Sequence, residues 1–201
     1  MSQQDDISYQ LETLAIRTGH TRTFEGEHGE PIFLTSSFVY ENAAEAAAKF
    51  SGQEPGNIYS RFTNPTVAMF EKRLAALEGA ERAVATSSGM AAIMAVMMAF
   101  LKAGDHVICS RAVFGSTVSM FEKYVAKFGV SVDFVDLTDL DAWKNAIKPE
   151  TKILFVESPS NPLAEVADIQ GLADIAHAND ALLAIDNSFW TPVLQQPIKF
   201  G

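Results

Sequence analysis

The sequence predicts an α/β domain with a mostly parallel sheet and flanking helices. Two apolar runs, at residues 153–156 and 181–185, each end in an acid, Glu157 or Asp186. Between these runs, residues 166–179 carry apolar side chains at the spacing of an amphipathic helix. A strand, a helix and a second strand in this order form a parallel crossover unit, which places both acids at the carboxyl edge of the sheet.

The composition bounds the class of protein. A chain of 201 residues can form one large domain, or such a domain with an arm. The net charge of -10 argues against a nucleic-acid partner and gives no support for an anionic membrane surface. The longest apolar run, residues 90–101, is too short to span a bilayer, and residues 1–7 are polar and acidic rather than a signal peptide. We therefore expect a cytoplasmic protein with neither a nucleic-acid nor a membrane partner.

Residues 1–62 show weak periodicity and are expected to form an arm. Helical spacing appears at residues 9–15 and 42–50, but glycine and proline interrupt the pattern repeatedly. Because such a segment buries little surface by itself, we expect it to lie across a neighbouring subunit. Residues 63–201 are expected to form the α/β domain.

Strands and helices alternate in this second part of the chain. Asn64 is a good N-cap, Pro65 suits a first helical turn, and Gly79 ends the helix. The apolar face expected for this helix consists of Val67, Phe70, Leu74 and Leu77. The strands expected after it are residues 83–85, 107–109, 130–135, 153–156 and 181–185. The helices expected between them are residues 90–101, 115–128, 140–147 and 166–179. Because the helix over residues 90–101 is apolar on every side, we expect it to be buried.

The start of that helix is a candidate anion site. Gly89 lets a ligand approach the backbone, and the free amides of a first helical turn attract an anion. The same pattern at Ser88, Gly89 and Met90 is also an ordinary helix cap, so both interpretations stay open. The four histidines lack metal-ligand spacing, which implies no metal site. The single cysteine, Cys109, lies in an apolar run, which indicates a buried thiol in a reducing compartment.

The acids at the strand ends are the second candidate site. Open parallel sheets bind ligands at the carboxyl ends of their strands, and an unpaired buried charge is costly. Alternatively, Glu157 and Asp186 cap the segments that follow them and face water. Two prolines surround Asn161 in the first of these segments, which predicts a stiff loop that holds a polar side chain. Tyr59 and Arg61, two apart in a segment expected to be extended, point the same way and could grip one phosphate, unless Arg61 is an ordinary surface arginine.

Together these motifs resemble the Cys/Met-metabolism family of pyridoxal-phosphate enzymes, which includes cystathionine synthases and lyases and homoserine-ester sulfhydrylases. The resemblance implies the fold-type-I transferase fold of pyridoxal-phosphate enzymes and pyridoxal 5'-phosphate as the cofactor. It implies that Tyr59 and Arg61 reach the cofactor phosphate of a neighbouring subunit. It also implies that Ser88, Gly89 and Met90 bind the phosphate within their own subunit.

The same resemblance assigns the residues around the cofactor ring. Phe114 is the position that stacks on the pyridine ring, and Asp186 is the position that pairs with the pyridine nitrogen. Asn161 lies beside the ring hydroxyl, and Glu157 and Ser188 complete the cofactor-binding shell. A carboxylate at Asp186 keeps that nitrogen protonated through a bond of about 1.5–3 kcal/mol, which the electron-sink chemistry requires. Asp186 and Phe114 are therefore the catalytic candidates.

Two departures from the family pattern shape the functional expectation. Many members carry tyrosine at the position of Phe114, and the Phe-Gly-Ser-Thr form most resembles the O-succinylhomoserine sulfhydrylase branch. Members also hold the cofactor through a Schiff-base lysine about twenty-five residues past the pyridine-binding aspartate. The sequence ends at Gly201 before that point, and the surroundings of Lys199 do not match the lysine motif. We expect an amino-terminal portion that lacks the carboxyl-terminal domain and is inactive by itself.

The expected reaction of the complete enzyme is γ-replacement on an activated homoserine. O-succinylhomoserine and sulfide would give homocysteine for methionine synthesis, in a homodimer or homotetramer whose active sites are shared across the dimer. Cystathionine γ-synthase, cystathionine lyase and methionine γ-lyase activities are alternatives within the family. Two further alternatives are a non-catalytic, truncated protein that binds phosphate ligands and an unrelated α/β domain without a cofactor.

Overall fold

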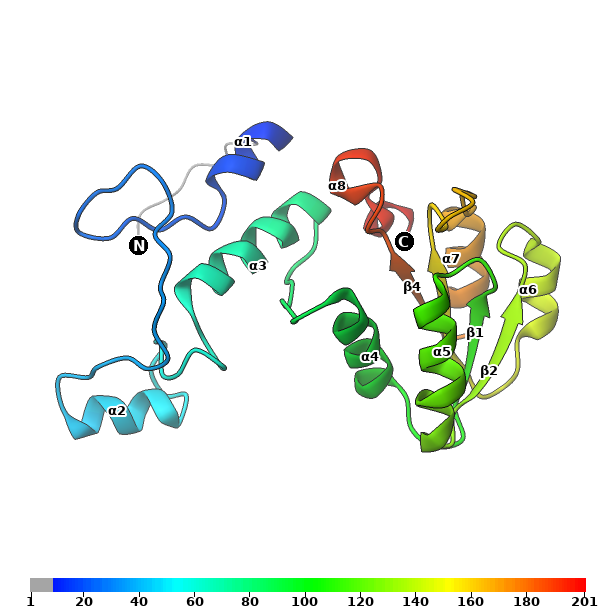
Figure 1. The fold of residues 1–201 in the computed structure, drawn as a ribbon, viewed down its shortest axis with the longest axis horizontal. Helices are drawn as coiled ribbons and strands as arrows, with labels where there is room; N and C mark the ends of the chain where they lie inside the picture. The colour runs from blue at the N-terminus through cyan, green and yellow to red at the C-terminus, as the bar shows by residue number, and fades with distance from the viewer. Residues whose placement is uncertain (1–8) are drawn as a thin grey trace. The chain divides into compact units, whose positions relative to one another are not determined.

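A computed structural model describes residues 9–201 of the chain, and residues 1–7, the expected acidic start, lie outside this part. The chain divides into two compact units, Met1–Ala85 and Thr86–Gly201. The described residues of the first unit form three helices, α1 (Leu11–Arg17), α2 (Ala43–Phe50) and α3 (Pro65–Glu78), joined by irregular segments (Figure 1). Two of these helices begin at the residues that the sequence predicts. Asn42 caps α2 by accepting a hydrogen bond from the Glu45 amide, and Asn64 caps α3 by accepting one from Thr66.

Helix α3 belongs to the first unit, so the boundary lies after Ala85 rather than after residue 62. The reason is a set of polar contacts between α3 and the segment before it. Arg73 donates a hydrogen bond to the Thr18 carbonyl at 2.9 Å and forms an ion pair with Glu30. The predicted apolar face of α3 is only partly covered: Val67 and Phe70 are 42% and 54% exposed. The expected contact of the arm with a neighbouring subunit stays a prediction.

The second unit is a parallel sheet with helices on both faces, as the sequence predicts (Figure 1). The strand order is β2-β1-β3-β4. The strands are β1 (His106–Ser110), β2 (Ser131–Val135), β3 (Thr151–Glu157) and β4 (Leu182–Asp186). The helices are α4 (Gly89–Phe100), α5 (Gly115–Lys123), α6 (Leu140–Ala146), α7 (Ile169–His177) and α8 (Thr191–Leu194). Two 3-10 helices, η1 (Val125–Phe128) and η2 (Pro197–Phe200), complete the unit.

Two hydrophobic clusters sandwich the sheet because successive strand residues point to opposite faces. On one face, Ile108 and Leu154 pack against Trp143 of α6 and the apolar stripe of α7. On the other face, the strand residues that alternate with Ile108 and Leu154, including Cys109, pack against α4 and α5. Cys109 is fully buried, which confirms the predicted structural thiol, and burial raises the pKa of this thiol well above its usual range. The central strands β1 and β3 are thus covered on both sides.

Of the five predicted strands, the first, residues 83–85, is wrong. This segment is irregular, and Val84 is 82% exposed. A strand exists through its ladder of hydrogen bonds, and none of the strands in the described part of the chain pairs with this segment. The amide of Ala85 instead donates to the Glu71 side chain at 2.8 Å. Local sequence alone does not reveal whether a neighbour is present.

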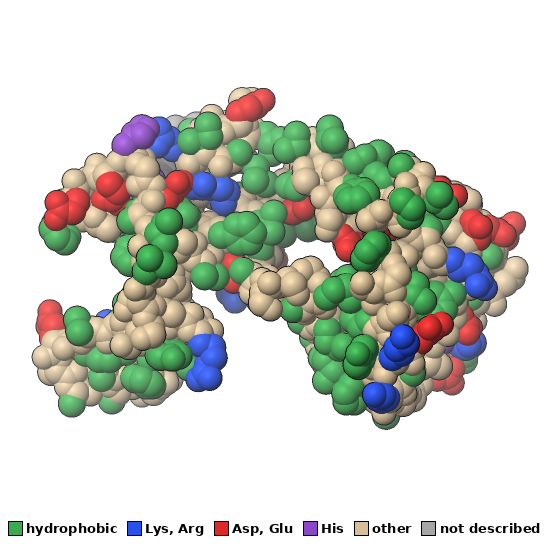
Figure 2. Space-filling view, in the orientation of Figure 1, with side chains coloured by type: hydrophobic (Ala, Val, Ile, Leu, Met, Phe, Trp, Pro, Cys, Tyr) green, Lys and Arg blue, Asp and Glu red, His purple; other side chains and the backbone are tan. Residues whose placement is uncertain are grey.

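The expectation that the helix over residues 90–101 is buried on every side is also wrong. Only Ile93 and Met97 of α4 are buried, whereas Met98 and Phe100 are 58% and 56% exposed. The reason is that α4 covers one face of the sheet, so its opposite side faces outward. Figure 2 shows hydrophobic side chains at the surface over this helix. Within residues 9–201, no helix combines the length and the apolar character that a membrane crossing requires.

Candidate active site

The carboxyl ends of β3 and β4 bring two acids together. In the parallel register, Glu157 of β3 is the Cα partner of Asp186 of β4. One residue further on, the Ser158 amide donates a hydrogen bond to the Asp186 carbonyl at 3.1 Å. The structure therefore confirms that the two acids are neighbours at the edge where parallel sheets bind ligands.

Glu157 is buried in this position, with 8% of its surface exposed. Its Oε2 accepts a hydrogen bond from the Phe114 backbone amide at 2.7 Å. Burial raises the pKa of the Glu157 carboxyl, the charge of Asp186 raises it further, and hydrogen bonds from the amides of Phe114 and Asn161 partly oppose the rise. The alternative in which this acid faces water is wrong for Glu157.

Asp186 has a different environment, because it is only partly buried. Its Oδ1 accepts two hydrogen bonds from Ser188, one from the backbone amide at 3.0 Å and one from the hydroxyl at 2.6 Å. Asp186 thus caps the turn that follows β4, as one of the two interpretations of the sequence predicts. Among the described residues, no donor in this turn bonds to its second carboxylate oxygen, so the carboxylate can still accept a hydrogen bond from a ligand.

The first turns of α4 and α5 form the part of the site that is a candidate for anion binding. The Ser88 hydroxyl caps α4 by accepting the Ala91 amide at 3.1 Å. The Thr117 hydroxyl, in the first turn of α5, contacts the Met90 sulfur at 3.9 Å, which ties the two helix starts together. A Cβ atom on Gly89 would meet no other atom of the described chain within 4 Å, so the space beside this backbone is open. The amides of a first helical turn have no intrahelical acceptor and can bind an anion in that space.

Phe114 lies between these two parts of the site. It is the residue before α5, and its side chain is 50% exposed, so one face of the ring is available to a ligand. Asn161 follows in the loop after β3, where the bonds before Pro159 and Pro162 are both cis. The site residues of the second unit predicted from sequence therefore gather at the carboxyl edge of the sheet.

Sequence reasoning missed a polar clasp at this edge, which is the set of hydrogen bonds that Gln195 makes with Ser158 and Asn187. Gln195 is 8% exposed, and its Nε2 donates to the Ser158 carbonyl at 3.1 Å and to Asn187 Oδ1 at 2.8 Å. Asn187 returns a hydrogen bond from Nδ2 to the Gln195 carbonyl at 2.9 Å. These contacts tie the segment after β4 to the segment after β3. A glutamine near the end of an irregular stretch carries no local signal of such a role.

Tyr59 and Arg61 lie in the first unit, and their predicted extended backbone is wrong. Tyr59 forms an isolated antiparallel bridge with Ser37, and the chain then turns, since the amides of Phe62 and Thr63 both donate to the Tyr59 carbonyl. The Arg61 guanidinium lies 5.6 Å from the centre of the Tyr59 ring and 5.0 Å from that of Phe62. Stacking in a turn, rather than strand alternation, brings the two side chains together.

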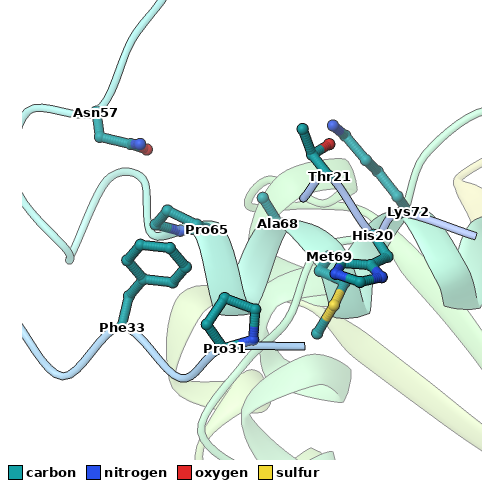
Figure 3. A pocket seen from close by; sticks show the side chains of 10 residues that line it. His20, Thr21, Pro31, Phe33, Asn57, Pro65, Ala68, Met69 and Lys72 are labelled. Carbon is teal, nitrogen blue, oxygen red and sulfur yellow. The ribbon is translucent and has the colours of Figure 1, made fainter. Parts of the chain in front are cut away.

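The first unit also contains a cavity of about 240 Å³ that holds none of the predicted site residues. Side chains from α3, including Met69 and Lys72, line it together with His20 and Phe33 (Figure 3). His20 Nε2 is buried, has no hydrogen-bond partner among the described residues, and lies 3.8 Å from Glu27 Oε1. Because this nitrogen is shielded from solvent, a ligand in the cavity would not contact it directly.

Comparisons with known proteins point in one direction. The family model described as Cys/Met metabolism PLP-dependent enzyme matches residues 12–201. The chain is 63% identical to an O-succinylhomoserine sulfhydrylase of Pseudomonas aeruginosa, over 95% of this chain and 47% of that protein. It is 41% identical to an L-methionine gamma-lyase of Fusobacterium nucleatum subsp. polymorphum, over 96% of this chain and 49% of that protein. The chain thus spans about half the length of the curated relatives that it matches.

A solved structure shows the same fold. A Campylobacter jejuni protein assigned as an O-acetylhomoserine (thiol)-lyase superposes with a TM-score of 0.91 at 35% sequence identity. The match covers 96% of this chain and 48% of that one, which carries a pyridoxyl-lysine 5'-monophosphate.

Proposed function

Because the chain belongs to the Cys/Met metabolism family of pyridoxal-phosphate-dependent enzymes, we propose that it forms the amino-terminal part of an O-succinylhomoserine sulfhydrylase. The cofactor of this family is pyridoxal 5'-phosphate. The proposed reaction is γ-replacement, in which sulfide displaces succinate from the γ-carbon of O-succinylhomoserine and homocysteine is formed for methionine synthesis. The observation that carries this proposal is the high identity to a sulfhydrylase of that substrate.

The residues of the second unit fit this cofactor. A phosphate needs hydrogen-bond donors, and the first turn of α4 provides backbone amides beside the open space at Gly89. An aromatic ring needs a flat apolar surface, which the half-exposed Phe114 offers. A pyridine nitrogen needs an anionic acceptor, and Asp186 is the acid at the sheet edge with a carboxylate oxygen to spare.

Each residue has one task in the proposed mechanism. When bound, pyridoxal 5'-phosphate supplies an electron sink for the pair released as a bond at the substrate α-carbon breaks. Asp186 holds the proton on the ring nitrogen through a charge-assisted hydrogen bond. Phe114 stacks on the ring and, lacking a hydroxyl, moves no proton. Ser88 and its neighbours bind the phosphate, while Asn161 and Ser188 support the ring from the two strand ends.

The whole enzyme requires parts that we assign outside these residues. Lys199, the lysine after Asp186, is exposed in η2 and lacks the family motif, so we assign covalent attachment of the cofactor to a lysine outside residues 1–201. Tyr59 and Arg61 are proposed to contact the phosphate bound by a neighbouring subunit. The proposed assembly is a cytoplasmic homodimer or homotetramer with active sites shared across the dimer.

A substrate-exchange assay tests the proposed reaction. The whole enzyme, purified and loaded with pyridoxal 5'-phosphate, is given O-succinylhomoserine with either sulfide or cysteine. Homocysteine formed from sulfide is the expected product. Cystathionine formed faster from cysteine would instead identify a cystathionine γ-synthase. The similarity to an L-methionine gamma-lyase favours a γ-lyase as the second candidate, which release of ammonia and a 2-oxoacid would identify.

A further inference from the structure

We propose that Glu157 is a positioning residue, which fixes the Phe114 ring by holding the Phe114 backbone amide. The inference deepens the proposed function, since a fixed ring matters most when it stacks on a cofactor. Glu157 itself is not assigned a contact with the cofactor. Its effect passes through Phe114, a residue that lies 43 positions away in the chain.

The Phe114 ring depends on its backbone for orientation. Half of its surface is exposed, so packing constrains the side chain on one side only. The backbone, in contrast, is held at both of its polar groups. The amide donates to Glu157 Oε2 at 2.7 Å, and the carbonyl accepts the Thr117 amide at 2.8 Å in the first turn of α5. Removal of the first contact would leave only the link to α5.

The contact with Glu157 replaces an ordinary helix cap. Several helices of this chain begin with a side chain that accepts an amide of the first turn, such as Ser88 for α4 and Asp139 for α6. Phe114 has no side chain that can cap α5. A residue with a capping side chain would stabilise the helix locally, but it would not offer an aromatic face. The chain instead anchors Phe114 from the neighbouring strand β3.

The location of Glu157 supports this assignment over a role as a surface acid. A carboxylate with 8% exposure is costly to bury, and its register partner Asp186 adds a second acid beside it. The backbone amides of Phe114 and Asn161 oppose this cost. An apolar residue at the end of β3 would avoid the cost and would lose the anchor. Glu157 therefore connects Phe114, in the segment after β1, to the paired strands β3 and β4, the second of which ends at Asp186.

Hydrogen exchange at the Phe114 amide tests the inference in cofactor-free protein. The rate is measured for the full chain by mass spectrometry with fragmentation that resolves single amides. Glu157→Ala removes the acceptor, so we expect exchange about tenfold faster than in the unchanged protein. Glu157→Gln retains an oxygen acceptor of the same reach, so we expect a rate within about threefold of the unchanged protein.

A matched control separates the anchor from the general effect of losing a strand-end acid. Asp136 follows β2, and among the described residues its side chain accepts hydrogen bonds from Thr138 alone, at 3.0 Å from the amide and 2.9 Å from the hydroxyl. Asp136→Ala should leave exchange at Phe114 unchanged. In the whole enzyme loaded with pyridoxal 5'-phosphate, the circular dichroism of the bound cofactor should weaken for Glu157→Ala and recover for Glu157→Gln.

The outcomes separate this inference from the proposed function. Exchange at Phe114 that stays at the original rate in Glu157→Ala overturns the inference, and so does a Gln variant as fast as the Ala variant. Should Glu157→Ala not fold, Glu157→Asp takes its place, because its shorter carboxylate falls short of the amide and faster exchange is again expected. A whole enzyme that binds no cofactor contradicts the proposed function, while the exchange rates still decide the role of Glu157.

Discussion

Glu157 and Asp186 are register partners at the ends of two adjacent parallel strands, yet their surroundings differ. Glu157 is buried and accepts a backbone amide from another part of the sheet edge. Asp186 is partly exposed and accepts two hydrogen bonds from its own turn. Paired acids in unlike environments commonly take different roles. Here one acid supports the site from within, and the other is placed to meet a ligand.

The role of Asp186 can be tested in the whole enzyme by comparing turnover with cofactor retention. Asp186→Ala removes the acceptor proposed for the ring nitrogen, a charge-assisted bond of about 1.5–3 kcal/mol. We expect kcat to fall about 10- to 100-fold, because each 1.36 kcal/mol corresponds to a tenfold change in rate. Cofactor content, measured by absorbance, should change little, since the phosphate contacts remain. Full turnover in this variant would show that the assigned role is wrong, and Asp136→Ala serves as the control.

Asn64 should contribute more to stability than a helix cap alone. Its Oδ1 accepts the Thr66 amide, and its buried Nδ2 donates to the Phe33 carbonyl and to Ser60 Oγ, each at 3.1 Å. We expect Asn64→Ala to lower the free energy of unfolding by about 2 kcal/mol in urea titrations. The exposed cap Asn42 of α2 provides the comparison, with an expected loss of about 1 kcal/mol on replacement by alanine. Equal losses would mean that the Nδ2 contacts contribute nothing.

His106 should make stability depend on pH. It is buried at the start of β1, where it is surrounded by Asp133, Lys148, Thr151 and Glu150. Burial is the main cause that lowers the pKa of its imidazole, and the charge of Lys148 is the second. The unfolded chain therefore takes up a proton at higher pH than the folded one. Stability should be complete above the unfolded pKa of about 6.5 and should fall as the pH drops below it.

The measurement compares unfolding free energies at pH 7.5 and pH 5.5 for the unchanged protein and His106→Gln. The contribution of one such group cannot exceed about 1.4 kcal/mol per pH unit. The unchanged protein should lose more stability than the variant over this interval. A variant with the same pH dependence would place the effect in other groups, such as the ion pair of Asp133 with Lys148 at 2.5 Å.

Cys109 should resist thiol reagents in the folded protein. The thiol is fully buried, and burial together with the nearby charge of Glu157 raises its pKa. Since the thiolate is the reactive form, we expect no labelling by a disulfide reagent at pH 8 until the protein unfolds, and then one thiol per chain. A cysteine introduced at Asp141, whose side chain is 85% exposed, is the positive control. Labelling of Cys109 at the rate of that control would contradict its burial.

Prediction from sequence succeeded where the signal is local or periodic. Asn64 and Gly79 mark the ends of α3 because capping chemistry depends on residues within one turn. The alternation of strands and helices placed Glu157 beside Asp186, because parallel crossover units align the ends of their strands. The same logic failed for residues 83–85, since a strand requires a neighbour that local sequence cannot specify.

The sequence by itself determined the parallel α/β architecture of the second unit, the buried thiol at Cys109 and the edge at which the candidate site lies. Only the tertiary structure decided how that site is held together. The anchor from Glu157 to Phe114 and the clasp of Gln195 on Ser158 join residues that are 43 and 37 positions apart. Such contacts have no period along the chain. They arise because the packed sheet brings separate loops to one edge, where each buried polar group must find a partner.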